Sequence, residues 1–148
     1  MILETTYSSK ENKELINDLV GKPFSFLQNI RMGGIGSKRM IIDKVSPSMR
    51  QVLNTVSDLN YGNIELRPKG ILLSITKGLR NFTWVVPYYQ FYMYHTPAVS
   101  IHAQGKFVLF KNNRTHRENE AFFKKLQRLK AEYDQQYPHV DSIDISTI

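Results

Sequence analysis

Cysteine is absent from this chain of 148 residues. The absence excludes disulfide bonds, catalysis by a thiolate, and every zinc site that includes a Cys ligand. Only the 4 histidines and the 13 Asp and Glu residues remain as metal ligands of the usual kinds. We therefore expect no structural metal ion and no cofactor.

A long apolar run is also missing. No segment approaches the roughly 20 apolar residues that a membrane-spanning helix needs. Residues 1–7 contain neither the basic region nor the apolar region of a secretory signal peptide. We expect a cytoplasmic protein without a transmembrane segment.

Acidic residues are absent from the middle of the chain. Between Leu66 and Arg117 there is no Asp or Glu, whereas this stretch contains eight basic residues: Arg67, Lys69, Lys77, Arg80, Lys106, Lys111, Arg114 and Arg117. The whole chain has a net charge of +7. A positive surface attracts nucleic acid, phospholipid headgroups or acidic proteins. The alternative is that the excess of lysine only keeps the protein in solution.

The size and composition indicate one globular domain. A chain of 148 residues, 41% hydrophobic and 22% charged, can bury a single continuous core. We expect a helical N-terminal elaboration over 1–61, a sheet with a C-terminal helix over 62–137, and a tail over 138–148.

Two helices are expected in the N-terminal part. A capping-box pattern formed by Ser8 and Glu11 predicts a helix over about 9–20. Pro47 suits the first position of a second helix, which we expect to continue until about Gly62. Its apolar residues recur at helical spacing: Met49, Val52, Leu53, Val56 and Leu59.

The segment between these helices allows two interpretations. Apolar stretches at 24–32 and 39–45 lie on either side of a glycine-rich run at 33–37. They can form two extended segments, or a helix and a strand. The glycine-rich run lacks the spacing of a phosphate-binding loop, which favours a tight turn.

From Gly62 onward the pattern changes to short apolar segments separated by polar turns. The expected strands are 64–67, 71–76, 82–86, 90–95, 99–103 and 107–110. Short strands with short turns predict an antiparallel β-meander, as a bent sheet or partial barrel. Thr115 and Glu118 form a second capping-box pattern, which predicts an amphipathic helix that caps the sheet and ends at about Tyr137. The predicted fold class is α+β.

The order of elements over 64–133 resembles the bacterial pleckstrin-homology-like fold, in which a C-terminal amphipathic helix plugs a bent antiparallel sheet. The segment 84–91 looks like that family's hydrophobic-Pro-Tyr step ahead of a strand. Phosphoinositide-binding members use a basic cluster in the first strand-turn-strand, where this chain has Arg67 and Lys69. The segment 61–71 is also similar to small bacterial proteins from which no activity can be carried over.

Alternating turns of a meander place one group of basic side chains at the same end of the sheet. This candidate anion site consists of Lys77, Arg80, Lys111, Arg114, His116 and Arg117. The start of the last helix would add free N–H donors beside it. The alternative is a charged sheet end that is only solvated.

Aromatic residues are concentrated between Phe82 and His95. Alternation after Pro87 directs Tyr92 and Tyr94 to one face, where they could form an exposed platform for bases or sugar rings. The alternative is that these rings cover helices packed on that face.

The sequence favours a non-enzymatic interaction module that presents a basic surface to an anionic ligand or an acidic protein partner. A nucleic-acid-binding protein that uses the basic and aromatic sheet surface is the first alternative. An enzyme is the second, because Ser100 and His102 share a face of one predicted strand, although no carboxylate lies near them in sequence.

Overall fold

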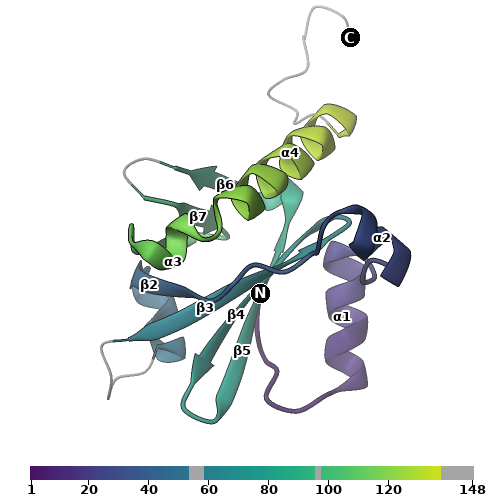
Figure 1. Cartoon of the computed structure of the whole chain (residues 1–148). Coiled ribbons are helices and arrows are strands. Elements are labelled where there is room, and N and C mark those ends of the chain that lie inside the picture. The colour runs from purple at the N-terminus through teal and green to yellow at the C-terminus, as the bar shows by residue number, and fades with distance from the viewer. Residues whose placement is uncertain (54–58, 96–97, 138–148) are drawn as a thin grey trace, which may run out of the picture.

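The structure is a computed structural model that describes residues 1–53, 59–95 and 98–137. These residues form an α+β fold with one 8-stranded antiparallel sheet, which confirms the predicted fold class (Figure 1). The strands are β1 (Ile2–Glu4), β2 (Met40–Val45), β3 (Asn60–Arg67), β4 (Gly70–Lys77), β5 (Arg80–Pro87), β6 (Phe91–Tyr94), β7 (Ser100–Ala103) and β8 (Lys106–Phe110). The helices are α1 (Lys10–Val20), α2 (Phe26–Arg31), α3 (Arg114–Arg117) and α4 (Glu120–Gln136), with 3₁₀ helices η1 (Pro47–Val52) and η2 (Tyr88–Gln90).

The strand order across the sheet is β1-β5-β4-β3-β2-β8-β7-β6. β3, β4 and β5 form one meander, and β6, β7 and β8 form another. The sequence predicted a single meander after residue 62, but β2 pairs with both β3 and β8 and joins the two halves. The chain leaves β5 at Pro87, which has no N–H for a strand ladder, and reaches the far edge of the sheet through η2.

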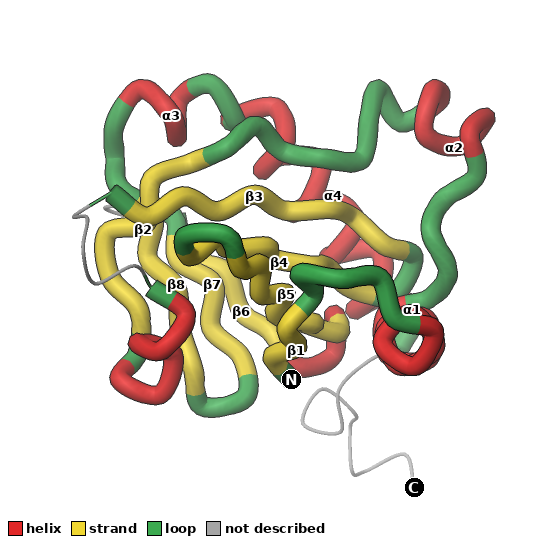
Figure 2. Tube along the Cα trace, turned by 90° about the horizontal axis from the view of Figure 1, so that it is seen from below, coloured by secondary structure: helices red, strands yellow, loops and turns green. Residues whose placement is uncertain are grey.

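The sheet curves strongly at β2, as Figure 2 shows. Gln104, in the turn between β7 and β8, reaches β5: its Oε1 accepts a hydrogen bond from Trp84 Nε1 at 3.2 Å, and its Nε2 donates to the Val85 carbonyl oxygen at 3.2 Å. These contacts hold the two halves together, so that their inner faces share one core.

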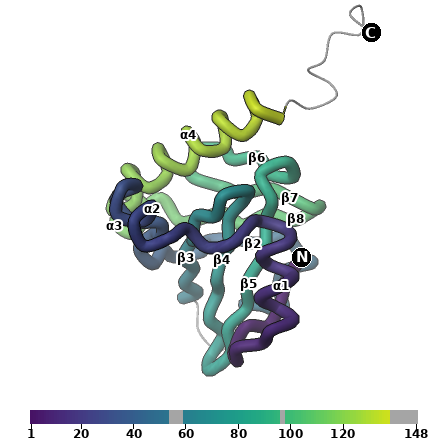
Figure 3. Tube along the Cα trace, turned by 90° about the vertical axis from the view of Figure 1, so that its right-hand side faces the viewer, coloured from purple at the N-terminus to yellow at the C-terminus, as the bar shows by residue number. Residues whose placement is uncertain are grey.

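α4 lies across the top of the sheet in Figure 3 and covers this main core. Phe122, Phe123 and Leu126 are the buried residues of the helix and belong to the same cluster as the inward residues of the strands. The predicted apolar stripe is therefore the face that packs. Burial of three such side chains stabilises the fold by several kcal/mol, at about 1.5–3 kcal/mol for each.

α1 covers the opposite face of β4 and β5. Ile16 and Val20 of the helix pack with Leu72 and Val85 in a second, smaller cluster. Because both faces of β4 and β5 are thus buried, their sequences are apolar in long runs rather than alternating. Ser9, one residue after the predicted cap, is the N-cap, and its Oγ accepts a hydrogen bond from Asn12 N.

The segment that allowed two interpretations forms a helix and a strand, α2 and β2. Ser25 and Gln28 make a reciprocal capping box, with Ser25 N donating to Gln28 Oε1 at 2.9 Å. Gly33 and Gly34, both at positive φ, end the helix. Glycine adopts this conformation without strain, which explains Gly33 and Gly34.

The helix predicted from Pro47 to about Gly62 is wrong in type and length. It is a 3₁₀ helix that ends at Val52, and β3 already begins at Asn60. Met49 and Val52, three residues apart, are both buried, which suits the three residues per turn of a 3₁₀ helix. Val56, part of the predicted helix, lies outside the described residues.

The single C-terminal helix predicted from Thr115 is two helices. Thr115 does not cap, because its Oγ1 accepts a hydrogen bond from Ile41 N in β2. Asn113 is the N-cap of α3, and the buried Asn119 separates α3 from α4 and accepts a hydrogen bond from Lys38 N at 2.8 Å. Bonds to β2 and the chain before it therefore break the helix.

β1 is an edge strand that the sequence did not predict; it pairs with β5 through Ile2 and Trp84. The predicted tail, 138–148, lies outside the described residues. Among the helices that the structure describes, none combines the length and the apolar composition needed to cross a bilayer.

Candidate functional site

The structure divides the predicted anion site into two groups. Lys77 and Arg80 flank the turn between β4 and β5, whereas Lys111, Arg114, His116 and Arg117 lie in α3 or just before it. The tip of the β4–β5 hairpin and α3 lie well apart in Figures 1 and 3. Alternating turns predicted one cluster, but the sheet curves and three strands separate β8 from β5.

Several of these charges already have partners. Arg80 Nη2 lies 2.7 Å from Glu4 Oε2 of β1, and Arg114 Nε lies 3.0 Å from Glu118 Oε1. Lys77 Nζ donates to the Gln51 carbonyl oxygen at 2.8 Å. Because β1 was not predicted, the sequence could not reveal that Glu4 neutralises Arg80.

His116 has a packing role. Its ring stacks on Phe123 of α4, with centroids 5.7 Å apart, and its Nδ1 is buried without a hydrogen-bond partner. It lines a hollow of about 240 Å³ together with His95 and Glu120. Within the described residues, no group of three His, Asp or Glu side chains could hold a metal ion.

The predicted aromatic platform lies on what we call the outer face: the side of β6, β7, β8 and β2 that points away from the main core. Its residues are Tyr92, Tyr94, Ser100, His102, Phe107, Leu109 and Lys44. Phe91, Ile101 and Val108, their chain neighbours, are buried in the main core. Tyr92 is 61% and Tyr94 57% exposed, so no described helix covers these rings. This exposure excludes the alternative that Tyr92 and Tyr94 cover helices packed on this face.

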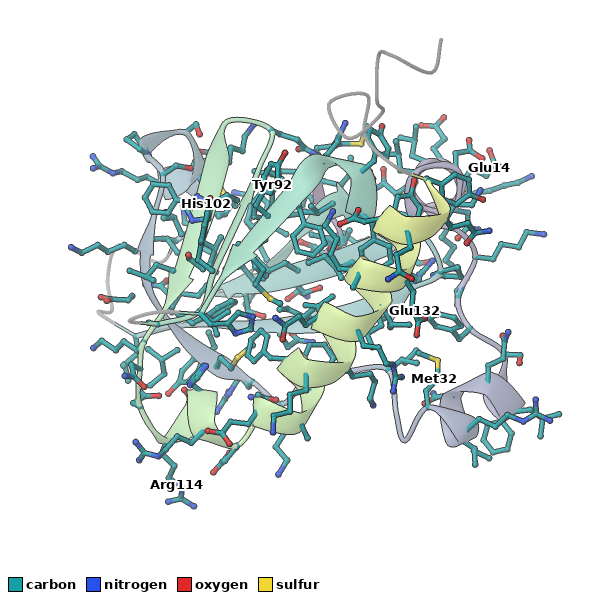
Figure 4. The ribbon with its side chains drawn as sticks, turned by 90° about the horizontal axis from the view of Figure 1, so that it is seen from above. Glu14, Met32, Tyr92, His102, Arg114 and Glu132 are labelled. Carbon is teal, nitrogen blue, oxygen red and sulfur yellow. The ribbon has the colours of Figure 1, made fainter. Side chains whose placement is uncertain are left out.

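Strand register arranges the outer face in two rows. Tyr92, His102 and Phe107 are direct cross-strand partners in one row. His102 stacks on Phe107, with centroids 5.6 Å apart, and meets Tyr94 of the second row edge-on at 5.1 Å. In Figure 4, Tyr92 and His102 lie close together and apart from α4. Three neighbouring strands thus present a continuous aromatic surface.

The second row ends in a cation. Tyr94 pairs with Ser100, Ser100 with Leu109, and Leu109 with Lys44 of β2. The register shifts between Ile42 and Lys44, so Ile42 and Val45 are both buried while Lys44 is exposed. An irregularity of this kind redirects side chains. Here it brings Lys44 to the outer face.

Two shallow hollows meet at Phe107. One, of about 310 Å³, is lined by Tyr92, His102, Lys106 and Phe107 among others. The other, of about 530 Å³, is lined by Phe107 together with Lys44, Arg50 and other residues near η1. The aromatic row therefore has cations near its Phe107 end.

The electrostatic environment of this face is positive. β6, β7 and β8 contain no acidic residue. β2 contains one, Asp43, which lies at the register shift next to Lys44. An anion that lies on the rings can contact Lys44, Arg50 or Lys106, and no carboxylate of β6, β7 or β8 repels it.

Ser100 and His102 do interact, since Ser100 Oγ lies 3.0 Å from His102 Nε2. The imidazole is otherwise in contact with the rings of Tyr94 and Phe107. A serine nucleophile needs a base that a third group orients, and no described carboxylate contacts His102. The pair is better suited to fixing the ring of His102 on the aromatic surface.

Sequence reasoning identified Tyr92 and Tyr94 and placed Ser100 and His102 on one face of a strand, but it missed Phe107, Leu109 and Lys44. Alternation in β8, where Val108 and Phe110 are buried, could have directed Phe107 outward. Lys44 gave no such signal because the register shift is invisible in the sequence. The position of Arg50 could not be predicted, because the segment forms a 3₁₀ helix and not the α-helix expected from the sequence.

No family model matches the chain, and no match was found among the curated proteins or the solved structures. What the protein binds must therefore be inferred from its own residues.

Proposed function

We propose that this protein is a non-enzymatic binding module whose outer face takes an anionic ligand with planar rings, namely single-stranded nucleic acid. The observation that carries the proposal is the row of Tyr92, His102 and Phe107 with Lys44, Arg50 and Lys106 near its Phe107 end. Rings alone could serve many partners. Rings on three strands without a carboxylate, with cations beside them, favour a polymer that alternates bases and phosphates.

Stacking supplies the first part of the affinity. Base stacking on aromatic side chains contributes about 1–3 kcal/mol for each base and tolerates any base, since each has a π-face. Tyr92 and Tyr94 are the most exposed rings of the outer face and stand on one edge strand. No strand of the described residues pairs with the outer edge of β6, which leaves room for a nucleic-acid backbone to pass along it.

Charge supplies the second part. Lys44, Arg50 and Lys106 can neutralise phosphates near the Phe107 end of the aromatic row, and such contacts make binding dependent on salt. The separated groups around Lys77 and Arg114 are less suited to this role, because ion pairs with Glu4 and Glu118 already hold Arg80 and Arg114.

The bent antiparallel sheet with a C-terminal amphipathic helix supports the pleckstrin-homology-like resemblance as a further part of this proposal. In this proposal β2, which joins β3 to β8, belongs to the same fold although it lies before residue 62. The fold would then serve as a scaffold, and the function depends on the side chains of the outer face. We place the protein in the cytoplasm, where RNA is available to it.

The proposal is tested by fluorescence anisotropy with a labelled oligouridine of about ten nucleotides. We expect Tyr92→Ala and Tyr94→Ala each to weaken binding by about fivefold or more, because each removes a stacking ring. Tyr89→Ala is the matched control, since Tyr89 is 51% exposed but belongs to η2 rather than to the outer face. Equal loss in all three variants, or no binding by the wild type, contradicts the proposal.

The same assay separates the other partner class. An acidic protein segment would compete with oligouridine for the cations but would not require Tyr92 and Tyr94. If polyglutamate displaced the oligonucleotide and bound the tyrosine variants as tightly as the wild type, an acidic protein partner would replace nucleic acid in the proposal.

A further inference from the structure

α2 presents an apolar surface that the proposed function does not use. Phe26, Leu27 and Ile30 are 79%, 67% and 61% exposed. They occupy positions i, i+1 and i+4 of the helix, so they lie on one side of it. No residue of α2 is buried, and the helix projects from the body of the molecule in Figures 1 and 4.

This helix is held in place at both ends. Phe24 before it and Met32 and Ile35 after it pack against the main core. The capping box of Ser25 and Gln28 fixes the first turn, and Lys125 Nζ of α4 donates to the Gly34 carbonyl oxygen at 2.8 Å. The exposed side chains are therefore presented by an ordered helix, and their exposure does not arise from a loose loop.

The chain on both sides of α2 carries charge of one sign. Between Asp18 and Asp43 the chain contains no acidic residue and four basic ones, all exposed: Lys22, Arg31, Lys38 and Arg39. None of the four forms an ion pair with a described residue. A projecting helix with large apolar side chains, preceded by Lys22 and ending at Arg31, matches the chemistry of an anionic lipid surface.

We propose that α2 inserts Phe26, Leu27 and Ile30 into the headgroup region of an anionic membrane, with Lys22 and Arg31 at the lipid phosphates. A helix that lies in the plane of a membrane interface buries its apolar face to a depth of about 5–10 Å. This role is separate from the outer face and does not depend on its ligand.

Vesicle sedimentation tests the proposal with phosphatidylcholine vesicles that contain or lack phosphatidylserine. We expect the wild-type protein to bind the vesicles with phosphatidylserine and to bind the others far less. The triple variant Phe26→Gln, Leu27→Gln and Ile30→Gln should lose at least about tenfold in partition coefficient. Arg31→Gln should lose about fivefold on the anionic vesicles only.

Leu79→Gln is the matched control, because Leu79 is 95% exposed in the β4–β5 turn, away from α2. It should bind vesicles like the wild type. The triple variant should keep the oligouridine affinity of the wild type, so that failure of this proposal and failure of the nucleic-acid proposal are distinguishable. The changed residues are exposed, and an unaltered urea midpoint will show that the fold is retained.

Phe26→Trp gives a direct reading of insertion. The native Trp84 is only 1% exposed, so its emission should not respond to vesicles. A blue shift of the new tryptophan on anionic vesicles supports the proposal. No vesicle binding by the wild type, or undiminished binding by the triple variant, overturns it. Self-association that the triple variant abolishes, without vesicle binding, would assign the surface to a second copy of the chain and also overturn it.

Discussion

The imidazole of His102 stacks on the ring of Phe107 in the neighbouring strand, with centroids 5.6 Å apart and ring planes 28° apart. Phe107 also lines both hollows of the outer face. Its ring therefore links the aromatic row to the cations near η1. Loss of this ring should interrupt the surface at its centre.

Phe107→Ala should weaken oligouridine binding by about tenfold, since it removes one stacking ring and the support of another. Phe107→Tyr keeps the ring and should stay within about twofold of the wild type. Anisotropy titrations at one fixed salt concentration measure both. An alanine variant that binds like the tyrosine variant would exclude Phe107 from the interface.

The salt dependence should identify the cations that contact phosphate. Removal of one cationic side chain that contacts a phosphate of single-stranded nucleic acid changes the slope of log affinity against log salt concentration by about 0.7. We expect this change for Lys44→Gln, Arg50→Gln and Lys106→Gln. Titrations across a series of salt concentrations give the slopes.

Arg114→Ala with Arg117→Ala is the comparison for the cluster predicted from the sequence. These residues belong to α3, and we expect an unchanged slope for the double variant. A lower slope in this variant, with normal slopes for the outer-face variants, would move the ligand to α3.

The sequence predicted most of the individual elements because local signals determine them. Pro68 and Gly70 give the turn between β3 and β4, and Gln104 and Gly105 the turn between β7 and β8, as the structure confirms. The apolar stripe of α4 was readable from its helical period. The same logic directed Tyr92 and Tyr94 outward.

Long-range pairing was not readable in this way. Insertion of β2 between β3 and β8 depends on contacts between segments about 60 residues apart, which no local pattern records. Asn119 breaks the last helix only because Lys38 is beside it. Likewise, Glu4 reaches Arg80 only through β1. For these reasons the cations that the sequence placed in one cluster lie in two groups, at the β4–β5 turn and at α3.

Gly70 should tolerate no side chain. A Cβ there would lie 2.4 Å from the Val86 carbonyl oxygen and 2.6 Å from Val20 Cγ1. Gly70→Ala must therefore displace α1 or β5, and we expect it to lower the free energy of unfolding by about 3 kcal/mol. Urea denaturation gives the value.

Gly78→Ala is the control for this substitution. Its φ is +60°, but no atom lies within 4 Å of the added Cβ. Backbone strain alone should then reduce the free energy of unfolding by about 1 kcal/mol. If the free energy of unfolding fell by the same amount in both alanine variants, close packing would not explain why position 70 requires glycine.

Tyr88 should make the stability fall at alkaline pH. Burial, with a smaller effect of Glu132, raises the pKa of this hydroxyl well above its ordinary value of 10.0. The folded state then keeps the proton that the unfolded state loses, so stability is full below pH 10.0 and declines as pH rises above it. The decline from one such group approaches about 1.4 kcal/mol per pH unit.

Tyr88→Phe should remove this part of the decline. It also removes the hydrogen bond from the hydroxyl to the Arg67 carbonyl oxygen, 3.3 Å long, which contributes about 1 kcal/mol at neutral pH. Urea denaturation of both proteins at a series of pH values measures the two effects. Parallel curves above pH 10.0 would show that Tyr88 ionises as readily in the folded state as in the unfolded state.

Photochemical cross-linking locates the ligand most directly. Oligouridine that contains 4-thiouridine is bound, irradiated and digested, and mass spectrometry identifies the modified peptides. We expect cross-links at Tyr92, His102 and Phe107 on the outer face. Cross-links confined to α3 or to the β4–β5 turn, or none at all, would contradict the proposal that the outer face binds single-stranded nucleic acid.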